Sequence, residues 1–425
     1  MSISINRRAS IWPFTLLIVA LSSLFYFIAS RPEAGRLADF TTGYYAAGET
    51  VLHHGSAALW PLVRDRWFVN LPIISWLCAP LALLGSWGAN VVFVLLGLMA
   101  TAGAFFLLAS NCPRGRPLLL LLFSLNGPLW YSLEIGNSTH FILLFLVSAL
   151  ALWKQRWMYF AGILLGISAV VKPLLILLGV YFLWRRSWRV VLGGATVVGL
   201  ALVATIAVFG LQFTLGWYQQ VVAAFAGKPM GAHNVQSLDA FLLRLEAGPE
   251  FLFNFNPHAL PLPLLAIRDA LVAGAFALIA WAMWLNRRPP ETMAADAPKG
   301  IDYLEFCLVL SACVTLSTVS WTHYYSLLLI PWSLYFFGQL PLRQGRLTHS
   351  LIWASVALCS LPCTYPRLSS GLLAEISART VQSVWLSGGL LLLCALLRSA
   401  IVHSSENIKP WLPRFFEQER ITPTA

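Results

Sequence analysis

Long runs of apolar residues without a charge are the feature that most constrains this chain. No Asp, Glu, Lys, Arg or His occurs in residues 11–30, 88–110 or 190–218. A helix needs about 20 apolar residues to cross the hydrocarbon core of a bilayer, and it satisfies its own backbone there. Membrane barrel strands would instead alternate apolar and polar residues. The sequence therefore predicts an all-α polytopic membrane protein.

The composition agrees with membrane insertion. Hydrophobic residues make up 58% of the chain and charged residues 11%, against about a quarter charged in typical soluble proteins. Arg7 and Arg8 precede the first apolar run, as they would in a signal peptide. That run is longer than a cleaved apolar core, and no small-residue cleavage site follows it. We therefore expect a retained signal anchor.

The net charge of +11 predicts an orientation. If both termini and the basic connections lie in the cytoplasm, those segments hold 18 basic and seven acidic residues, and the opposite face is neutral. Basic residues concentrate on the cytoplasmic side of membrane proteins, so the charge is explained without nucleic acid as a partner. The basic connections are Arg114/Arg116, Lys154/Arg156, Arg185/Arg186/Arg189, Arg287/Arg288/Lys299 and Arg343/Arg346.

The connections predict about 11 to 13 spanning helices. Residues 71–110 form either two short helices or one helix with a re-entrant segment, and Pro173 either kinks or divides residues 158–184. We divide the chain into a transmembrane core (1–285) with two long outer loops (31–70 and 211–261), a cytoplasmic linker (286–300), C-terminal transmembrane helices (301–403) and a cytoplasmic tail (404–425).

Asp39, in the first outer loop, is the candidate general base. The stretch after it mixes Tyr44, Tyr45 and Glu49 with apolar residues, which is typical of a short helix in the membrane interface. A carboxylate there can reach both an embedded lipid and a water-borne acceptor, and can take a proton from a sugar hydroxyl while a lipid phosphate leaves. Alternatively, Asp39 only caps the helix that follows.

Two cations are candidates for binding the phosphate of a donor. Lys172 is the only charged residue in 158–184, and an ionisable residue inside a transmembrane segment suggests function. A lysine facing an outer cavity can hold a phosphate as a point charge, although it can also snorkel to the interface. Arg244, in the second outer loop, offers a bidentate grip on phosphate.

Polar residues of the outer connections are candidates for sugar or acceptor binding. Glu134 and Asn137 flank Gly136, and they either bind sugar hydroxyls or only form a turn. Gln236 suits sugar hydroxyls, or lies in an ordinary loop. We place Tyr44 and Tyr45 in the same group.

The SWTH segment at 320–323 supplies two further candidates. Trp321 can stack on a sugar ring or an isoprenoid, or only anchor the interface. His323 can donate to a phosphate, assist Asp39 in catalysis, or be structural.

Neither metal nor redox chemistry is indicated. The seven cysteines contain no CxxC, and the eight histidines show no HExxH or similar ligand spacing. We therefore expect no metal and no cofactor other than a lipid-linked sugar as co-substrate. Cys78, Cys307, Cys313 and Cys394 lie in apolar runs and are expected to be packed thiols.

The order of these motifs resembles glycosyltransferase family 87, the mannosyltransferase-like membrane enzymes of the GT-C class. The matching pieces span residues 39–331 and are DFxxxYYxA from Asp39, Gly55, LWP (59–61), NLP (70–72), APL (79–81), GN (136–137), GILLG (162–166), KP (172–173), QSL (236–238) with Arg244, and SWxH (320–323). The chain departs from the family pattern at GNS (136–138), at Thr318 and at Tyr324.

The resemblance implies a GT-C fold in the bacterial inner membrane, with its active site on the extracytoplasmic face. It implies a polyprenyl-phosphate sugar as donor, often mannose, a glycan or glycolipid acceptor, and inversion at the anomeric carbon. It maps the catalytic aspartate onto Asp39. Two other classes stay open: a lipid or solute transporter or flippase, and an inactive scaffold for envelope assembly. A transporter would break helices in both halves, whereas only the Lys172-Pro173 break is predicted.

Overall fold

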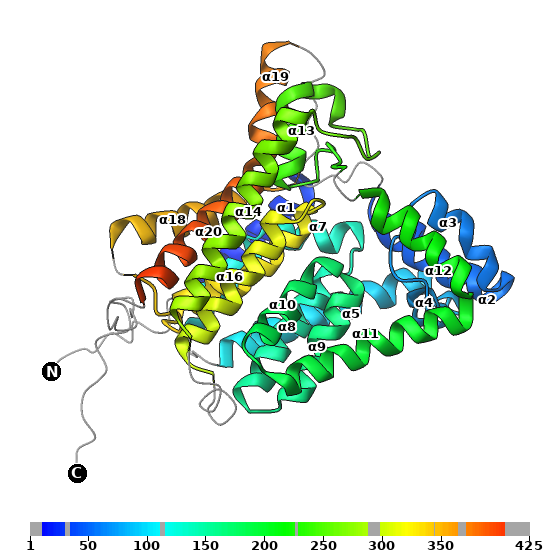
Figure 1. The fold of residues 1–425 in the computed structure, drawn as a ribbon, viewed down its shortest axis with the longest axis horizontal. Helices are drawn as coiled ribbons and strands as arrows, with labels where there is room; N and C mark the ends of the chain where they lie inside the picture. The colour runs from blue at the N-terminus through cyan, green and yellow to red at the C-terminus, as the bar shows by residue number, and fades with distance from the viewer. Residues whose placement is uncertain are drawn as a thin grey trace.

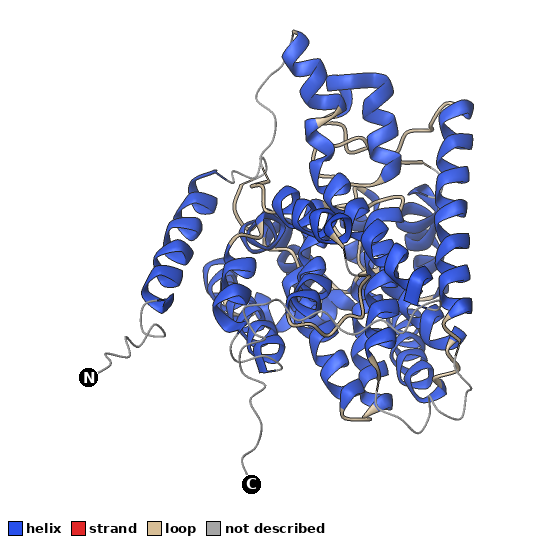
Figure 2. Cartoon of the chain, turned by 90° about the vertical axis from the view of Figure 1, so that its left-hand side faces the viewer, coloured by secondary structure: helices blue, strands red, loops and turns tan. Residues whose placement is uncertain are grey.

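The computed structural model describes residues 11–29, 35–110, 115–225, 228–287, 298–343, 345–363 and 371–403. Helices dominate these segments, and the only β-type pairing among them is one antiparallel bridge between Val235 and Trp321. The first apolar run forms α1 (Ile11–Ala29), which lies at the edge of the bundle next to α6 (Arg116–Ser124) (Figure 2). The all-α polytopic membrane class is confirmed.

Four segments of the described chain are long and apolar enough to cross a bilayer. They are α5 (Gly85–Ser110), α11 (Trp188–Phe209), α14 (Leu262–Leu285) and Leu372–Val402. A fifth is counted if α6 and α7 (Gly127–Ile135), which meet at a bend of 56°, form one span. Fewer helices meet this criterion than we expected, because several apolar runs are divided into short helices.

Both ambiguous stretches resolve into divided helices. Proline lacks an N–H and disfavours helical backbone at the residue before it. Accordingly, α9 (Met158–Val171) ends before Lys172, and a 3-10 turn, η4 (Pro173–Leu175), leads into α10 (Ile176–Trp184). In the earlier stretch α4 (Ile74–Ala82) has nine residues. At 1.5 Å per residue it is too short to span a bilayer, so only α5 is long enough to cross there.

A second break, between α6 and α7, was not predicted. The side chain of Asn126 accepts a hydrogen bond from the Leu129 N–H at 2.8 Å and so caps the start of α7. An asparagine inside an apolar run can cap a new helix, and Asn126 is therefore the sequence signal for this break. Both breaks lie in the N-terminal half of the chain.

The centre of the molecule is α16 (Gly300–Leu316), in which every residue after Gly300 except Tyr303 is buried. It packs against α10, α14 and α20 (Val384–His403) (Figure 1). Helices on both sides of the predicted linker contribute to one hydrophobic cluster. The linker itself lies mostly outside the described residues, as do Arg7, Arg8, Arg114, Arg288 and the tail from residue 404.

The expected packing of the cysteines holds in part. Cys307 and Cys313 are buried within α16, and Cys78 is partly exposed. The expectation for Cys394 was wrong, because its side chain is exposed on α20. An apolar run does not reveal which face of a helix is turned away from the protein.

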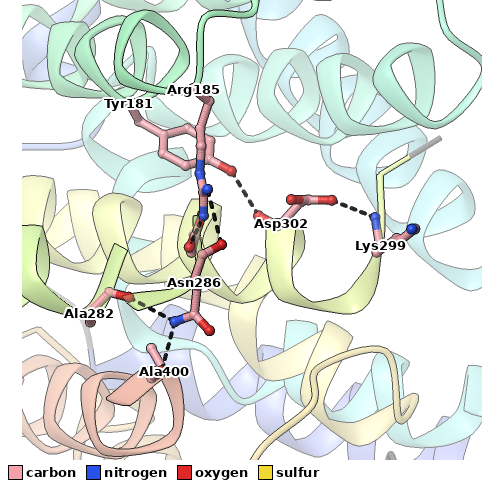
Figure 3. A network of polar contacts seen from close by, with 8 residues as sticks. Tyr181, Arg185, Ala282, Asn286, Lys299, Asp302 and Ala400 are labelled. Atoms are coloured by element: carbon pink, nitrogen blue, oxygen red, sulfur yellow. Dashed lines mark hydrogen bonds and ion pairs between the residues drawn. The ribbon is translucent and has the colours of Figure 1, made fainter. Parts of the chain in front are cut away.

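A network of polar contacts stabilises one end of the bundle (Figure 3). Arg185, which follows α10, donates from Nε to Glu305 at 2.7 Å and from Nη1 to the Asn286 carbonyl at 3.3 Å. Asn286 donates in turn to the Ala400 carbonyl of α20 at 2.8 Å, and the Lys299 N–H bonds Asp302 at the start of α16. Connections that the charge distribution assigns to one membrane face therefore lie at one end of the bundle.

The first outer loop folds as a small helical unit with its own core. It contains η1 (Asp39–Tyr45), α2 (Ala46–His54), η2 (Ser56–Leu59) and α3 (Trp60–Arg64), which pack with α4 and α12 (Leu211–Trp217) (Figure 1). The helix expected after Asp39 is thus present. Gly48 allows α2 to cross α4 closely, because a Cβ there would lie 2.7 Å from the Cys78 carbonyl.

The second outer loop also contains helices. After α12 come η5 (Tyr218–Val222) and η6 (Ala223–Phe225), and then α13 (Leu238–Ala247) and η7 (Gly248–Phe251). In Figure 1, α13 and α19 (Leu372–Arg379) rise together beyond the rest of the molecule. η8 (Thr322–Leu328) begins within the predicted turn at residues 320–323 and leads into α17 (Leu329–Phe336). α18 (Arg346–Cys359) and η9 (Val381–Ser383) complete the described elements before α20.

Candidate functional site

The backbone around Asp39 is fixed from both sides. Leu37 has a φ of +57°, a left-handed conformation that non-glycine residues rarely adopt, and its N–H donates to the Glu134 carbonyl at 2.6 Å. Phe40 is fully buried and stacks on Phe93 of α5, with ring centroids 4.1 Å apart. These contacts hold the start of η1 against the turn between α7 and α8 (Thr139–Lys154).

Asp39 does not cap the helix that it begins, because no side-chain capping hydrogen bond forms at the start of η1. Its Oδ2 instead accepts a hydrogen bond from Asn137 Nδ2 at 2.7 Å. Its Oδ1 has no hydrogen-bond partner among the described residues, and the side chain is partly exposed. The alternative that Asp39 is only a helix cap is therefore not what the structure shows.

Asn137 links the predicted base to the predicted phosphate ligand. It follows Gly136, which ends α7 with φ +71°, and it is buried before α8 (Thr139–Lys154). Its Oδ1 accepts from Lys172 Nζ at 2.9 Å, from the Thr139 hydroxyl at 2.8 Å and from the Thr139 N–H at 3.2 Å. Asp39 and Lys172 therefore bind opposite ends of one amide.

Lys172 lies at the break between α9 and η4, where the extended backbone before Pro173 (φ −131°) ends the helix. Its side chain is 5% exposed. Besides the bond to Asn137, Nζ lies 4.8 Å from the centroid of the Tyr324 ring, a cation–π distance. The ammonium is thus buried in the protein and bonded to Asn137, which is not the exposed end that a snorkelling lysine presents.

Competing effects act on the protonation of Asp39. Burial raises the pKa of its carboxyl, because the charged form loses hydration. The hydrogen bond from Asn137 and the positive charge of Lys172 counteract part of this rise in pKa. The carboxyl group of Asp39 is thus a weaker acid than that of a solvated aspartate. Its charged form still accepts one hydrogen bond, from Asn137.

The two adjacent tyrosines of η1 point in different directions. The Tyr44 hydroxyl lies 2.8 Å from Ser138 Oγ, in the turn that carries Asn137. The Tyr45 hydroxyl donates to Glu49 at 3.3 Å, away from that turn. The structure therefore brings only Tyr44 to the polar site.

Trp321 and His323 lie in a row of rings beside the site. Successive centroids from Phe255 through Trp321 and His323 to Tyr131 are 6.4, 6.3 and 6.3 Å apart, with planes inclined by at most 29°. His323 is buried, and neither of its ring nitrogens has a hydrogen-bond partner among the described residues. Buried polar groups in native structures are normally satisfied, so these nitrogens suit a substrate oxygen. Tyr324, 4.9 Å from His323 between centroids, joins this row to the lysine.

Arg244 and Gln236 hold the second outer loop together. The Arg244 guanidinium is fully buried and donates to Ser383 Oγ at 2.8 Å and to three loop carbonyls at 2.8–3.2 Å, those of Gly231, Ala232 and Val235. The Gln236 amide donates to the carbonyls of His233 and Gln382 at 3.0 and 2.6 Å. These donors bind the protein itself, so neither residue enters the site that we propose.

Sequence reasoning missed Thr139 and Tyr324 as parts of the site. A signal for Thr139 exists, because an asparagine whose side chain accepts from the N–H two residues later forms a common local turn, and Asn137 does so. Tyr324 was noted only as a departure from the family pattern. Its contact with Lys172 could not be predicted, since it depends on the packing of η8 against distant helices.

No cluster of three His, Cys, Asp or Glu side chains suited to a metal ion occurs in the part of the chain that the structure describes. The expectation that the site uses neither a metal nor a cofactor stays a prediction.

The class of this protein follows from its similarity to a known family. The model of glycosyltransferase family 87 matches residues 68–301, more than half of the chain. The chain belongs to glycosyltransferase family 87. The predicted family is thus confirmed, and this family 87 member is a glycosyltransferase with several apolar helices able to cross a membrane. The matched region contains Asn137 and Lys172, whereas Asp39 precedes it and His323 follows it. No curated protein matches the chain.

Proposed function

We propose that this family 87 protein is an inverting GT-C glycosyltransferase of the bacterial inner membrane. It moves mannose from a polyprenyl-phosphate donor to a hydroxyl group of a glycan or glycolipid on the extracytoplasmic face. Asp39 is the general base and Lys172 binds the donor phosphate. One observation carries this proposal: the carboxylate and the ammonium bind the same amide, that of Asn137.

The position of Asp39 suits a base that acts on an incoming acceptor. Its Oδ1 lacks a protein partner among the described residues, and the side chain is partly exposed. Asp39 takes the proton of the acceptor hydroxyl as the acceptor oxygen bonds to C1 of the donor sugar. The bond from C1 to the phosphate oxygen breaks on the opposite face, and its electron pair leaves with the polyprenyl phosphate.

Lys172 is placed to stabilise that leaving group. An ammonium has three N–H donors, and one of them is used for Asn137. The others are available for phosphate oxygens, whose negative charge grows as the bond to C1 breaks. A fixed cation in a site with little water is an effective stabiliser of such charge.

His323 and Trp321 provide the remaining contacts in this proposal. The N–H of His323, which has no partner among the described residues, can donate to a phosphate or sugar oxygen. The Trp321 ring can stack on a sugar face. Tyr44 borders the same turn through Ser138. The roles of Tyr45 and Glu134 in acceptor binding stay predictions.

The test is transfer from radiolabelled polyprenyl-phosphate mannose to membrane glycolipid by purified protein in liposomes. We expect Asp39→Asn to lower the rate about a hundredfold or more without changing insertion or thermal stability. Asp65→Asn is the matched control and should transfer at the wild-type rate. Asp65 is an exposed carboxylate of the same loop, and its one ion-pair partner among the described residues is Arg64.

Three results would overturn the proposal. Transfer by Asp39→Asn at the wild-type rate would show that Asp39 is not the general base. Movement of labelled lipid across the liposome by a wild-type protein that transfers no sugar would favour the flippase alternative, and neither movement nor transfer would favour the scaffold. Donors carrying other sugars, run in parallel, test the assignment of mannose.

A further inference from the structure

We propose that Asn137 is the positioning residue of this site, and not a ligand of sugar or acceptor. Its amide keeps Asp39 in the carboxylate form, leaves Oδ1 to receive the acceptor's proton, and fixes the base relative to Lys172. This inference rests on the proposed function, because it assigns a role to a neighbour of the proposed base.

The surroundings of Asn137 determine which way its amide points. A backbone N–H and a lysine ammonium can only donate hydrogen bonds. The amide atom that faces Lys172 Nζ at 2.9 Å and the Thr139 N–H at 3.2 Å must therefore be the oxygen. The NH₂ group is then directed at Asp39 Oδ2, 2.7 Å away. The reverse orientation would set the NH₂ group against two donors.

This orientation of the Asn137 amide favours the deprotonated state of Asp39. A carboxyl group protonated on Oδ2 would place its hydrogen against the hydrogens of the amide, whereas a carboxylate accepts the bond. Hydrogen bonds to a charged group are stronger than those between neutral groups. The proton that Asp39 receives during transfer must therefore arrive on Oδ1, the atom that has no partner among the described residues.

The hydrogen bonds of Asn137 argue against its direct contact with a substrate. Both ends of its amide are already used by three residues of the protein. A sugar hydroxyl would have to displace one of these partners. The amide is thus built into the protein as a link between two functional groups.

The groups that face Asp39 decide how its titration responds to a change at Asn137. The titratable groups with an electrostatic influence are Lys172 at the α9–η4 break, Tyr44 of η1 and Tyr324 of η8. Lys172 is the cation among them, and shortening Asn137 does not remove its charge. Loss of the amide donor therefore acts on Asp39 in one direction, toward easier protonation.

The test compares the pH dependence of transfer by Asn137→Ala and Asn137→Asp with that of the wild type. We expect the acidic limb of the kcat/KM profile to move up by about one pH unit in Asn137→Ala. Asn137→Asp keeps the shape of the side chain, so it addresses the case in which the alanine variant fails to fold. It should move the limb at least as far, because it sets a second carboxyl beside Asp39. Thr139→Val removes only one of the bonds that hold the amide, and should give a smaller shift in the same direction.

The control is Asn126→Ala, which removes another buried asparagine, the cap of α7. It should lower thermal stability but keep the wild-type pH profile. A second readout needs no transfer: infrared titration of the Asp39 carboxyl band, identified by its absence in Asp39→Asn. An unchanged titration in both Asn137 variants would overturn the positioning role even if Asp39→Asn is inactive. An active Asp39→Asn would instead overturn the proposed function.

Discussion

Gly136 lies so close to Phe40 that a Cβ on the glycine would come within 2.7 Å of the Cβ of Phe40. Gly136 also has φ +71°, where an alanine is strained by about 1–2 kcal/mol. We expect Gly136→Ala to push the start of η1, and with it Asp39, away from Asn137. Transfer should fall at least tenfold, measured with saturating donor and acceptor.

Gly85→Ala is the matched control for this prediction. Gly85 has φ +67°, but nothing lies within 4 Å of its Cβ position, so the variant experiences the backbone strain without the collision. Equal loss of transfer in both variants would show that strain alone, and not displacement of Asp39, is responsible.

Replacement of Lys172 by methionine tests the phosphate site. The variant keeps much of the apolar stem but has no charge to offer the leaving phosphate. We expect kcat/KM for the lipid-linked donor to fall about a hundredfold, while the KM for acceptor changes little. Lys228→Met changes an exposed lysine of the second outer loop and should be neutral. A rise in acceptor KM alone would place Lys172 on the acceptor side.

The pH dependence of the wild type follows from the position of Asp39. A general base works only when deprotonated, so transfer must fall as the pH drops through its pKa. Burial raises the pKa of Asp39, and the acidic limb should therefore lie above the pH at which a solvated aspartate titrates, about 4. The measurement is kcat/KM against pH in liposomes, and a limb at or below that value would contradict the burial of the base.

Arg244→Lys separates a structural role from phosphate binding. Lysine cannot reproduce the bonds of the guanidinium to three carbonyl groups and Ser383, and buried carbonyls that lose a partner are costly. We expect thermal stability to fall and transfer to fall for all substrates alike. A selective rise in donor KM at unchanged stability would instead restore Arg244 as a phosphate ligand.

Features of this protein could be predicted from the sequence where they depend on neighbouring residues, and not where they depend on contacts between distant parts of the chain. The apolar runs predict the membrane class because burial in lipid is a property of each segment alone. The division at Pro173 and the turn at Gly136 are equally local, and both are present. Asp39 and Lys172 could be singled out individually, because a lone charge next to an apolar run needs a reason.

The partners that each polar side chain binds could not be predicted from the sequence. Arg244 and Lys172 are both buried cations, yet one binds loop carbonyls and the other an amide of the site. Only the folded arrangement of α13 against η9 and of α9 against the α7–α8 turn distinguishes them. The same limit applies to Asn137, whose partners Asp39 and Lys172 come from distant parts of the chain.

The crossing of α9 and α11 provides a final prediction, because it sets the position of the helix that ends at Lys172. Gly162 of α9 lies against the Val190 carbonyl, and Gly193 of α11 lies against the Tyr159 carbonyl, each with no room for a Cβ. Small residues spaced by four, as in Gly162 and Gly166, allow such close packing of membrane helices. In Gly162→Ala the helices must separate, at a cost of about 1–3 kcal/mol. We expect a lower melting temperature in detergent and weaker transfer, since Lys172 moves with α9. Gly199→Ala, on α11 but with no neighbour within 4 Å, should be neutral or stabilising because alanine favours helix. Equal destabilisation by both variants would mean that glycine flexibility, and not the close crossing, is what α9 and α11 require.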